Sequence, residues 1–268
     1  MSERNGFFET ERITPKSLSI VIVVASFLQW LLYQLLLSVK VGLNTECFAF
    51  AQIFVVLLSA PYLTAISFRQ ESRYVDSGIM LVLSSAAVGK RILRILIISL
   101  IPIVGWILLS SVFAAVVIGM PIVKALNMIV VLTLFSLAVG AVGLCGARAY
   151  RDTLFGTLFT YLLLGILISS AFLIKPLERY INDLQPVFEP ILHLNPVIAV
   201  CTIFDGLDVL RNPLFYELTP IPYHDYTYPA WYMNVFWQLV IGACSFLWTW
   251  WMCRATKSVS DRAMLKFC

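Results

Sequence analysis

The side chains most able to do chemistry lie in the last third of the chain. Its two histidines are His193 and His224, and Asp205, Asp208 and Asp225 stand near them in sequence. Imidazoles and carboxylates of this kind bind divalent metals, but their spacing matches no established ligand pattern. We therefore predict no metal site in the chain.

Elsewhere, the apolar stretches of the chain carry essentially no acid and no histidine. No nucleophile–base set or carboxylate pair is visible in them, which disfavours a membrane-embedded enzyme. They also lack the ionisable relay of ion-coupled transporters and the charged ring of many channels. Their amides are interpreted as hydrogen-bonding groups between helices, with substrate contact as the alternative. These amides belong to Gln29, Gln34, Gln52, Asn127, Asn234 and Gln238.

Energy for moving a substrate would have to come from another polypeptide. The chain holds no GxxxxGK[ST] loop, the motif whose backbone amides cradle nucleotide phosphates. We expect no cofactor in this chain and no ATP hydrolysis by it alone. Any ATPase that binds ATP and Mg²⁺ to drive such movement would have to be a separate polypeptide.

Composition indicates an all-α integral membrane protein. Hydrophobic residues make up 60% of the 268 and charged residues 13%, with a mean hydropathy of +0.88. A soluble domain averages about 45–50% apolar and about 25% charged residues. One crossing of the bilayer needs roughly 20 apolar residues, and the sequence predicts six such spans. They are Ser17–Val39, Phe48–Ser67, Ile92–Ile118, Ala125–Ala147, Leu154–Ile174 and Trp231–Cys253.

The spans divide the chain into three parts: an N-terminal segment, 1–16; a transmembrane domain, 17–253; and a tail, 254–268. Within the domain, the stretch 175–230 breaks the pattern, because its apolar pieces at 179–193 and 196–210 are too short to cross. We predict two short re-entrant helices there, with a turn near His193–Pro196. Asn195 would cap the second helix and Pro196 would be its first residue. The following loop, rich in tyrosine and proline, is interpreted as an aromatic belt, with an outer partner as the alternative.

The distribution of Lys and Arg predicts the orientation in the inner cell membrane. Placing both termini in the cytoplasm puts 14 of the 19 basic residues on the inner face and 5 on the outer face. The positive-inside rule selects this topology. The outer five are Lys40, Lys124, Lys175, Arg179 and Arg211.

The longest charged loop of the N-terminal half, residues 68–91, is predicted to form a short helix at the inner surface. Such a helix could be an ordinary interfacial element or could bind a cytosolic partner and transmit its motion to two spans. Its apolar positions are Ile79, Leu81 and Val82, and its charges are Arg69, Glu71, Arg73 and Asp76. Arg148, Arg151 and Asp152, in the next inner loop, either bound their helices or contact the same partner.

Three stretches, read together, resemble ABC-2-type (type V exporter-like) permeases. The first is SFRQESRYVDSGIMLVLSSAAVGKRILRILIISLIPIV, in which Glu71 and Gly89–Lys90 stand at the family's positions. The second is GAVGLCGARAYRDTLFGTLFTYLLLGIL, and the third is HLNPVIAV, similar to the family's NP element. The resemblance covers about residues 60–205 and includes the six-span layout.

The resemblance implies a transporter half. Two such membrane subunits, identical or related, would assemble with two cytosolic ATPase subunits, and residues 7–16 would form an amphipathic elbow. The residues that would couple to the ATPase are Glu71, Arg73, Asp76, Ile79, Leu81, Val82 and Arg151. The re-entrant helices would form an extracytoplasmic gate at His193, Asn195 and Pro196.

The function expected from these features is ATP-driven export or flipping of an amphipathic or lipid-linked substrate. The alternative is a non-translocating membrane partner that transmits ATPase motion to an extracytoplasmic protein or assembly. Neither interpretation involves nucleic acid, and the sequence does not identify the substrate or its binding residues.

Overall fold

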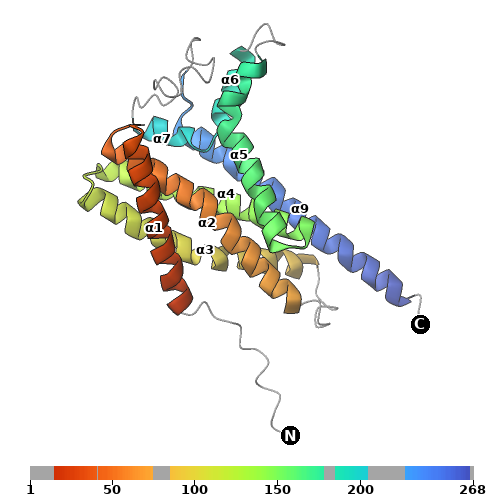
Figure 1. The fold of residues 1–268 in the computed structure, drawn as a ribbon. Helices are drawn as coiled ribbons and strands as arrows, with labels where there is room; N and C mark the ends of the chain where they lie inside the picture. The colour runs from red at the N-terminus through yellow and green to blue at the C-terminus, as the bar shows by residue number, and fades with distance from the viewer. Residues whose placement is uncertain (1–14, 41, 75–84, 178–184, 205–226, 266–268) are drawn as a thin grey trace.

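A computed structural model describes residues 15–40, 42–74, 85–177, 185–204 and 227–265 of the chain. The described part consists of helices joined by short turns and contains no strand (Figure 1). Six of its helices are long and two are short. The helices are α1 (Pro15–Ser38), α2 (Asn44–Tyr74), α3 (Ser85–Val116), α4 (Ile122–Tyr150), α5 (Thr153–Leu177), α6 (Gln185–Leu194), α7 (Ile198–Ile203) and α9 (Trp231–Leu265).

The six long helices are each long and apolar enough to cross a membrane, as the sequence predicts. Several extend beyond the predicted spans: α2 begins at Asn44 and continues to Tyr74, and α9 continues to Leu265. Pro61 and Pro102 both lie inside continuous helices. The spans are Ser19–Ser38, Asn44–Gln70, Val88–Val116, Ile122–Tyr150, Thr153–Phe172 and Trp231–Arg254.

Helix α4 lies at the centre of the bundle, where it packs most extensively on α9 and α2 and also contacts α3 and α5. Its glycines permit this close approach. A Cβ on Gly143 would lie 2.6 Å from the Pro61 carbonyl oxygen of α2. On the other side, a Cβ on Gly242 of α9 would lie 2.7 Å from the Cα of Ala138. Small residues at helix contacts are the main device for packing helices in lipid.

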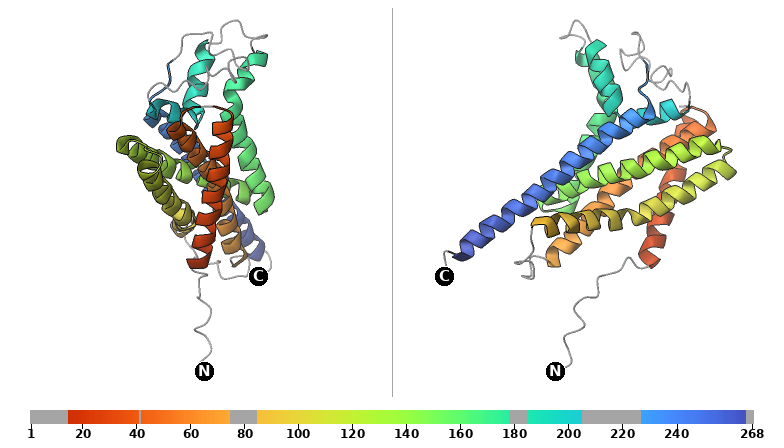
Figure 2. Two further views of the ribbon diagram at one scale, coloured as in Figure 1. Left: turned by 60° about the vertical axis from the view of Figure 1, so that its left-hand side comes forward. Right: turned by 180° about the vertical axis from the view of Figure 1, so that it is seen from behind.

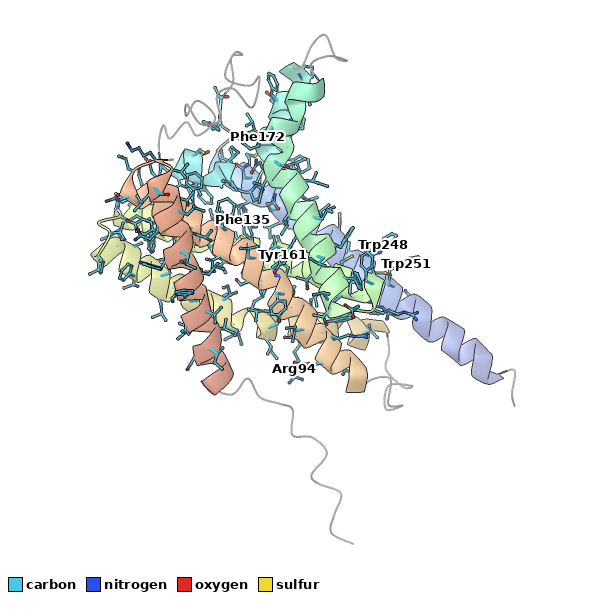
Figure 3. All side chains as sticks on the ribbon, viewed as in Figure 1. Arg94, Phe135, Tyr161, Phe172, Trp248 and Trp251 are labelled. Carbon is cyan, nitrogen blue, oxygen red and sulfur yellow. The ribbon has the colours of Figure 1, made fainter. Side chains whose placement is uncertain are left out.

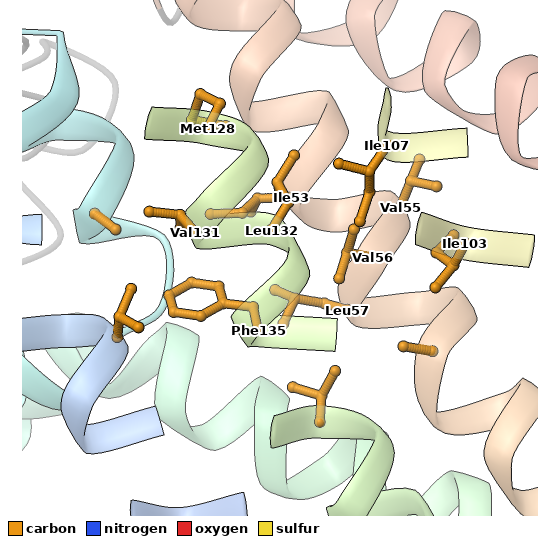
Figure 4. Close-up of a cluster of buried hydrophobic side chains, with 14 of the residues drawn as sticks. Ile53, Val55, Val56, Leu57, Ile103, Ile107, Met128, Val131, Leu132 and Phe135 are labelled. Carbon is orange, nitrogen blue, oxygen red and sulfur yellow. The ribbon is translucent and has the colours of Figure 1, made fainter. Parts of the chain in front are cut away.

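The buried core runs between α2, α3 and α4 (Figure 4). Phe135 and Leu132 of α4 are almost wholly buried, as are Ile53 of α2 and Ile103 of α3. A hydroxyl adds a polar contact to this apolar interface, because Thr64 Oγ1 donates to the Gly140 carbonyl oxygen at 2.9 Å. The core therefore joins the second, third and fourth spans into one packed unit.

The outer faces of α1, α5 and α9 are apolar and exposed. Only 11% of the most apolar stretch of α1 is buried, compared with 67% for α2 and α4. The start of α1 and the end of α9 lie at one end of the bundle, and α6 and α7 lie at the other (Figures 1 and 2). This arrangement places the two ends of the helical region on the same side.

Candidate gate and coupling regions

The turn between α6 and α7 is held by amide side chains of α9. Helix α6 ends at Leu194, and the last carbonyls of a helix have no partner inside it. Asn234 Nδ2 donates to the carbonyl oxygens of Leu192 at 2.7 Å, His193 at 3.1 Å and Asn195 at 3.2 Å. One turn along α9, Gln238 Nε2 donates to the Leu194 carbonyl oxygen at 2.5 Å. The end of α6 is thus capped by another helix.

Asn195 ties the same turn to α5. Its side chain is 4% exposed, and its Nδ2 donates to the Ile168 carbonyl oxygen at 2.9 Å. Its Oδ1 accepts a hydrogen bond from the Val197 amide at 3.0 Å. Because a buried polar group costs free energy unless it is paired, these two contacts account for an asparagine at this depth. The turn therefore bridges the C-terminal half of α5 and the first turns of α9.

The predicted start of the second short helix is wrong by two residues. Asn195 was expected to cap it and Pro196 to be its first residue, but α7 begins at Ile198. Pro196 is buried in the turn that precedes it. The Ile198 amide donates to the Asn195 carbonyl oxygen at 3.3 Å, which closes the turn. The side chain of Asn195 still satisfies an amide near the helix start, the role that caps perform.

Two short helices lie where the sequence predicts them, and their re-entrant character stays a prediction. Helix α6 covers the end of the piece expected at 179–193, and α7 covers the beginning of the piece expected at 196–210. Residues 178–184 and 205–226 lie outside the described part of the chain. Both helices pack on α9, and α7 is tied further by Thr202 Oγ1, which donates to the Pro229 carbonyl oxygen at 2.8 Å.

His193 lies on the last turn of α6 and is half-buried. Its Nδ1 donates to the Glu189 carbonyl oxygen at 2.7 Å, so the ring is oriented by its own helix. Among the described residues, no group of three His, Cys, Asp or Glu side chains is placed to hold a metal ion. The other residues considered for metal binding, Asp205, Asp208, His224 and Asp225, lie outside the described part.

The predicted coupling residues fall mostly outside the described part. Glu71 and Arg73 lie in the last turn of α2, where the structure describes the backbone. Asp76, Ile79, Leu81 and Val82 lie in the stretch 75–84, which the structure does not describe. The predicted surface helix there remains a prediction.

Arg151 is placed at the C-terminal end of α4, where it is exposed and adopts a left-handed conformation with φ of 53°. This conformation ends α4 and turns the chain directly into α5. Asp152 then caps α5, because its Oδ1 accepts from the amides of Leu154 at 2.7 Å and Phe155 at 3.1 Å. Nearby, Arg148 Nη2 donates to the Met252 carbonyl oxygen of α9 at 3.3 Å. Arg148, Arg151 and Asp152 therefore lie at the boundary between α4 and α5, as the first of the two interpretations predicts.

A buried polar linkage joins the first three spans. Gln52 Nε2 of α2 donates to Ser110 Oγ of α3 at 2.9 Å, and Ser110 Oγ donates to Gln29 Oε1 of α1 at 2.8 Å. The amides in the spans thus form helix–helix hydrogen bonds at these positions, as expected. Sequence reasoning missed the more specific role of Asn234 and Gln238. Their four-residue spacing places both on one face of α9, and that spacing was the available signal.

Comparison with known proteins adds no family to these observations, since no family model, curated protein or solved structure matches the chain. The class supported by the fold alone is a multi-pass helical membrane protein with six candidate spans.

Proposed function

We propose that this chain is the membrane-spanning subunit of an ATP-driven exporter of the ABC-2 type. The chain would export or flip an amphipathic or lipid-linked substrate as one of two permease copies. A separate cytosolic ATPase would bind ATP and Mg²⁺ and supply the energy. The proposal places both termini in the cytoplasm and the α6–α7 turn on the outer side of the inner membrane.

The observation that carries the proposal is the anchored α6–α7 turn. Two short helices follow the fifth span and pack on the sixth, and the turn at His193, Asn195 and Pro196 is bonded to both spans. Irregular backbone at membrane depth persists only where protein shelters it. This arrangement supports a re-entrant element over the outer ends of α5 and α9, in the position of a gate.

A second support is chemical. Within the described residues, the spans carry their charges near their ends, so they offer no buried acid or histidine for ion coupling. A transporter without such groups needs another energy source. The loop 68–91 is the proposed entry point for that energy, since it joins α2 to α3 and would move both together.

The proposal is tested by isolating the complex from cells and measuring ATP hydrolysis. Alone, the purified chain should hydrolyse no ATP, and a cytosolic ATPase should co-purify with it. Replacing both Ile79 and Leu81 by Asp should abolish co-purification, because burying an unpaired carboxylate in an apolar groove costs several kcal/mol. The control carries Ile79→Leu and Leu81→Met, which keep the volume and polarity.

Unchanged co-purification and ATPase stimulation in the double Asp variant would exclude this loop as the coupling element. If no ATPase accompanied even the native chain, the proposed class itself would be wrong. Transport is then separated from force transmission by reconstituting the complex in vesicles and following a fluorescent lipid. Flipping that depends on ATP supports an exporter, and its absence in an ATP-hydrolysing complex supports the non-translocating alternative.

A further inference from the structure

Positive charge gathers at the end of the bundle opposite α6 and α7. Of nine Lys and Arg with described side chains, seven lie at this end, and Asp152 is the one acid described there. Asp152 is occupied in capping the amides of Leu154 and Phe155. Figure 3 shows one of the cations, Arg94, at the edge of this end. The seven are Arg69, Lys90, Arg91, Arg94, Arg148, Arg151 and Arg254.

Three helices converge within this charged end. Trp250 of α9 lies against Gly89 of α3, where a Cβ would be 3.5 Å from the indole Cδ1 and Nε1. Helix α4 meets α9 at the same level through Arg148 and the Met252 carbonyl oxygen. The guanidinium of Arg254 lies over the Trp250 ring, with Cζ 5.8 Å from the ring centroid. This junction therefore joins the start of α3, the end of α4 and the last apolar turn of α9.

Lys90 and Arg254 flank this junction from two helices. Lys90 follows Gly89 directly, and Arg254 is one helical turn beyond Trp250. Both side chains therefore leave the backbone within one turn of the contact between Gly89 and Trp250. Both side chains are exposed. Cations on adjacent helices make this end of the bundle electropositive, and Asp152 is the one acid whose side chain is described there. A bound anion would be attracted to this positive potential.

The position of the junction along the spans places it at the level of a bilayer surface. The apolar span of α3 begins at Val88 and that of α9 ends at Arg254, so Lys90 and Arg254 both lie in the terminal turn of a span. On α9, Trp251 lies one turn before Arg254 and Trp248 one turn before Trp251; each is 55% exposed, and their ring centroids are 5.3 Å apart (Figure 3). Exposed tryptophans of this kind mark the headgroup level of a membrane.

We infer that the junction of α3, α4 and α9 binds the phosphate of an anionic phospholipid. Lys90 and Arg254 would pair with the phosphate oxygens, and Trp248 and Trp251 would lie along the glycerol and upper acyl chains. Charge-assisted bonds to phosphate are among the strongest that Lys and Arg make. Basic clusters between membrane helices at this level commonly recognise acidic headgroups. The inference is independent of the proposed transport function.

The test uses the full chain, delipidated in a neutral detergent and titrated with single lipids. Native mass spectrometry counts bound lipid, and thermal unfolding gives the shift in Tm. Phosphatidylglycerol should bind more tightly than phosphatidylcholine of the same acyl chains, and added salt should weaken it. Lys90→Gln and Arg254→Gln should each weaken phosphatidylglycerol binding about fivefold, which corresponds to about 1 kcal/mol per charge.

Two matched variants keep the test specific. Lys40→Gln removes an exposed cation at the opposite end of the bundle and should leave phosphatidylglycerol binding unchanged. Arg254→Lys keeps the charge and should retain most of the binding. Equal binding of the two lipids would overturn the inference, as would equal effects of Lys40→Gln and Arg254→Gln. Displacement of phosphatidylglycerol by millimolar inorganic phosphate would also overturn it, since the site would then take free phosphate.

Discussion

Asn234 offers the sharpest test of the anchored turn between α6 and α7. Its Nδ2 contacts three backbone carbonyls, those of Leu192, His193 and Asn195, and the residue is completely buried. Its Oδ1 has no hydrogen-bond partner among the described residues. The amide is therefore used as a donor, and Asn234→Asp replaces that donor by an acceptor of the same shape. We expect the turn to open in this variant.

The size of the effect follows from these contacts. Polar contacts between membrane helices average about 0.6 kcal/mol each. Losing the two N–H donors of Asn234 should therefore destabilise the closed turn by at least about 1.2 kcal/mol. Leaving a buried carbonyl unpaired adds about 1–3 kcal/mol. Together these losses amount to about 2–4 kcal/mol, which raises the open fraction of the turn about 30-fold to 1,000-fold.

Hydrogen exchange of the full chain in nanodiscs measures this opening directly. Amides of residues 185–204 should exchange faster in Asn234→Asp by the factor given above, because local opening controls their exchange. Asn234→Leu should have a smaller effect, since it also removes the unpaired Oδ1. The matched control is Asn127→Leu, a half-buried asparagine of α4. Less than a threefold change in Asn234→Asp would refute the claim that α9 holds this turn.

Three further predictions concern packing and topology. Gly143→Ala should lower the free energy of unfolding, followed by thermal unfolding, by about 1–3 kcal/mol, because the new Cβ would meet the Pro61 backbone. Gly105→Ala is the control, since it has open space around it and should be neutral or stabilising. Equal effects of the two substitutions would contradict the close packing of α2 and α4. Ser110→Ala should cost about 1–2 kcal/mol through the loss of two contacts between helices, and Ser245→Ala, whose hydroxyl bonds within α9, should cost less. In a background without native cysteines, an impermeant reagent added outside cells should label Glu189→Cys and not Arg151→Cys; the reverse pattern would invert the predicted orientation.

The six spans could be predicted from the sequence because their signal is local. Each is an apolar run whose length alone matches the bilayer, and all six appear as helices with ends shifted by a few residues. The short helices before the last span were predictable for the same reason, since their runs are too short to cross. The start of α7 was misplaced because Asn195 and Pro196 fit a helix start in isolation. In the fold, Asn195 instead bonds to α5, which holds both residues in a turn.

The capping of α6 by α9 depends on contacts that no local pattern contains. Asn234 lies about 40 residues beyond the carbonyls it binds, so their partnership appears only when α9 returns past α6. The central place of α4 was hidden for a related reason. In the sequence, the glycines of α4 look like ordinary small residues. Only the structure shows that α4 packs closely against Pro61 of α2 and Gly242 of α9.

Helices α4 and α9 together connect the two ends of the molecule. At one end, α9 holds the α6–α7 turn through Asn234, and at the other it accepts the Arg148 contact at Met252. These positions are 18 residues apart, or about 27 Å along a helix that rises 1.5 Å per residue. Between them, Gly242 lies so close to Ala138 that a single methyl group would not fit, which leaves little freedom for the helices to slide. A displacement at the charged end would therefore reach the turn through the backbone of a packed helix pair. Under the proposed function, this pair is the physical route by which motion at the ATPase side would move the gate.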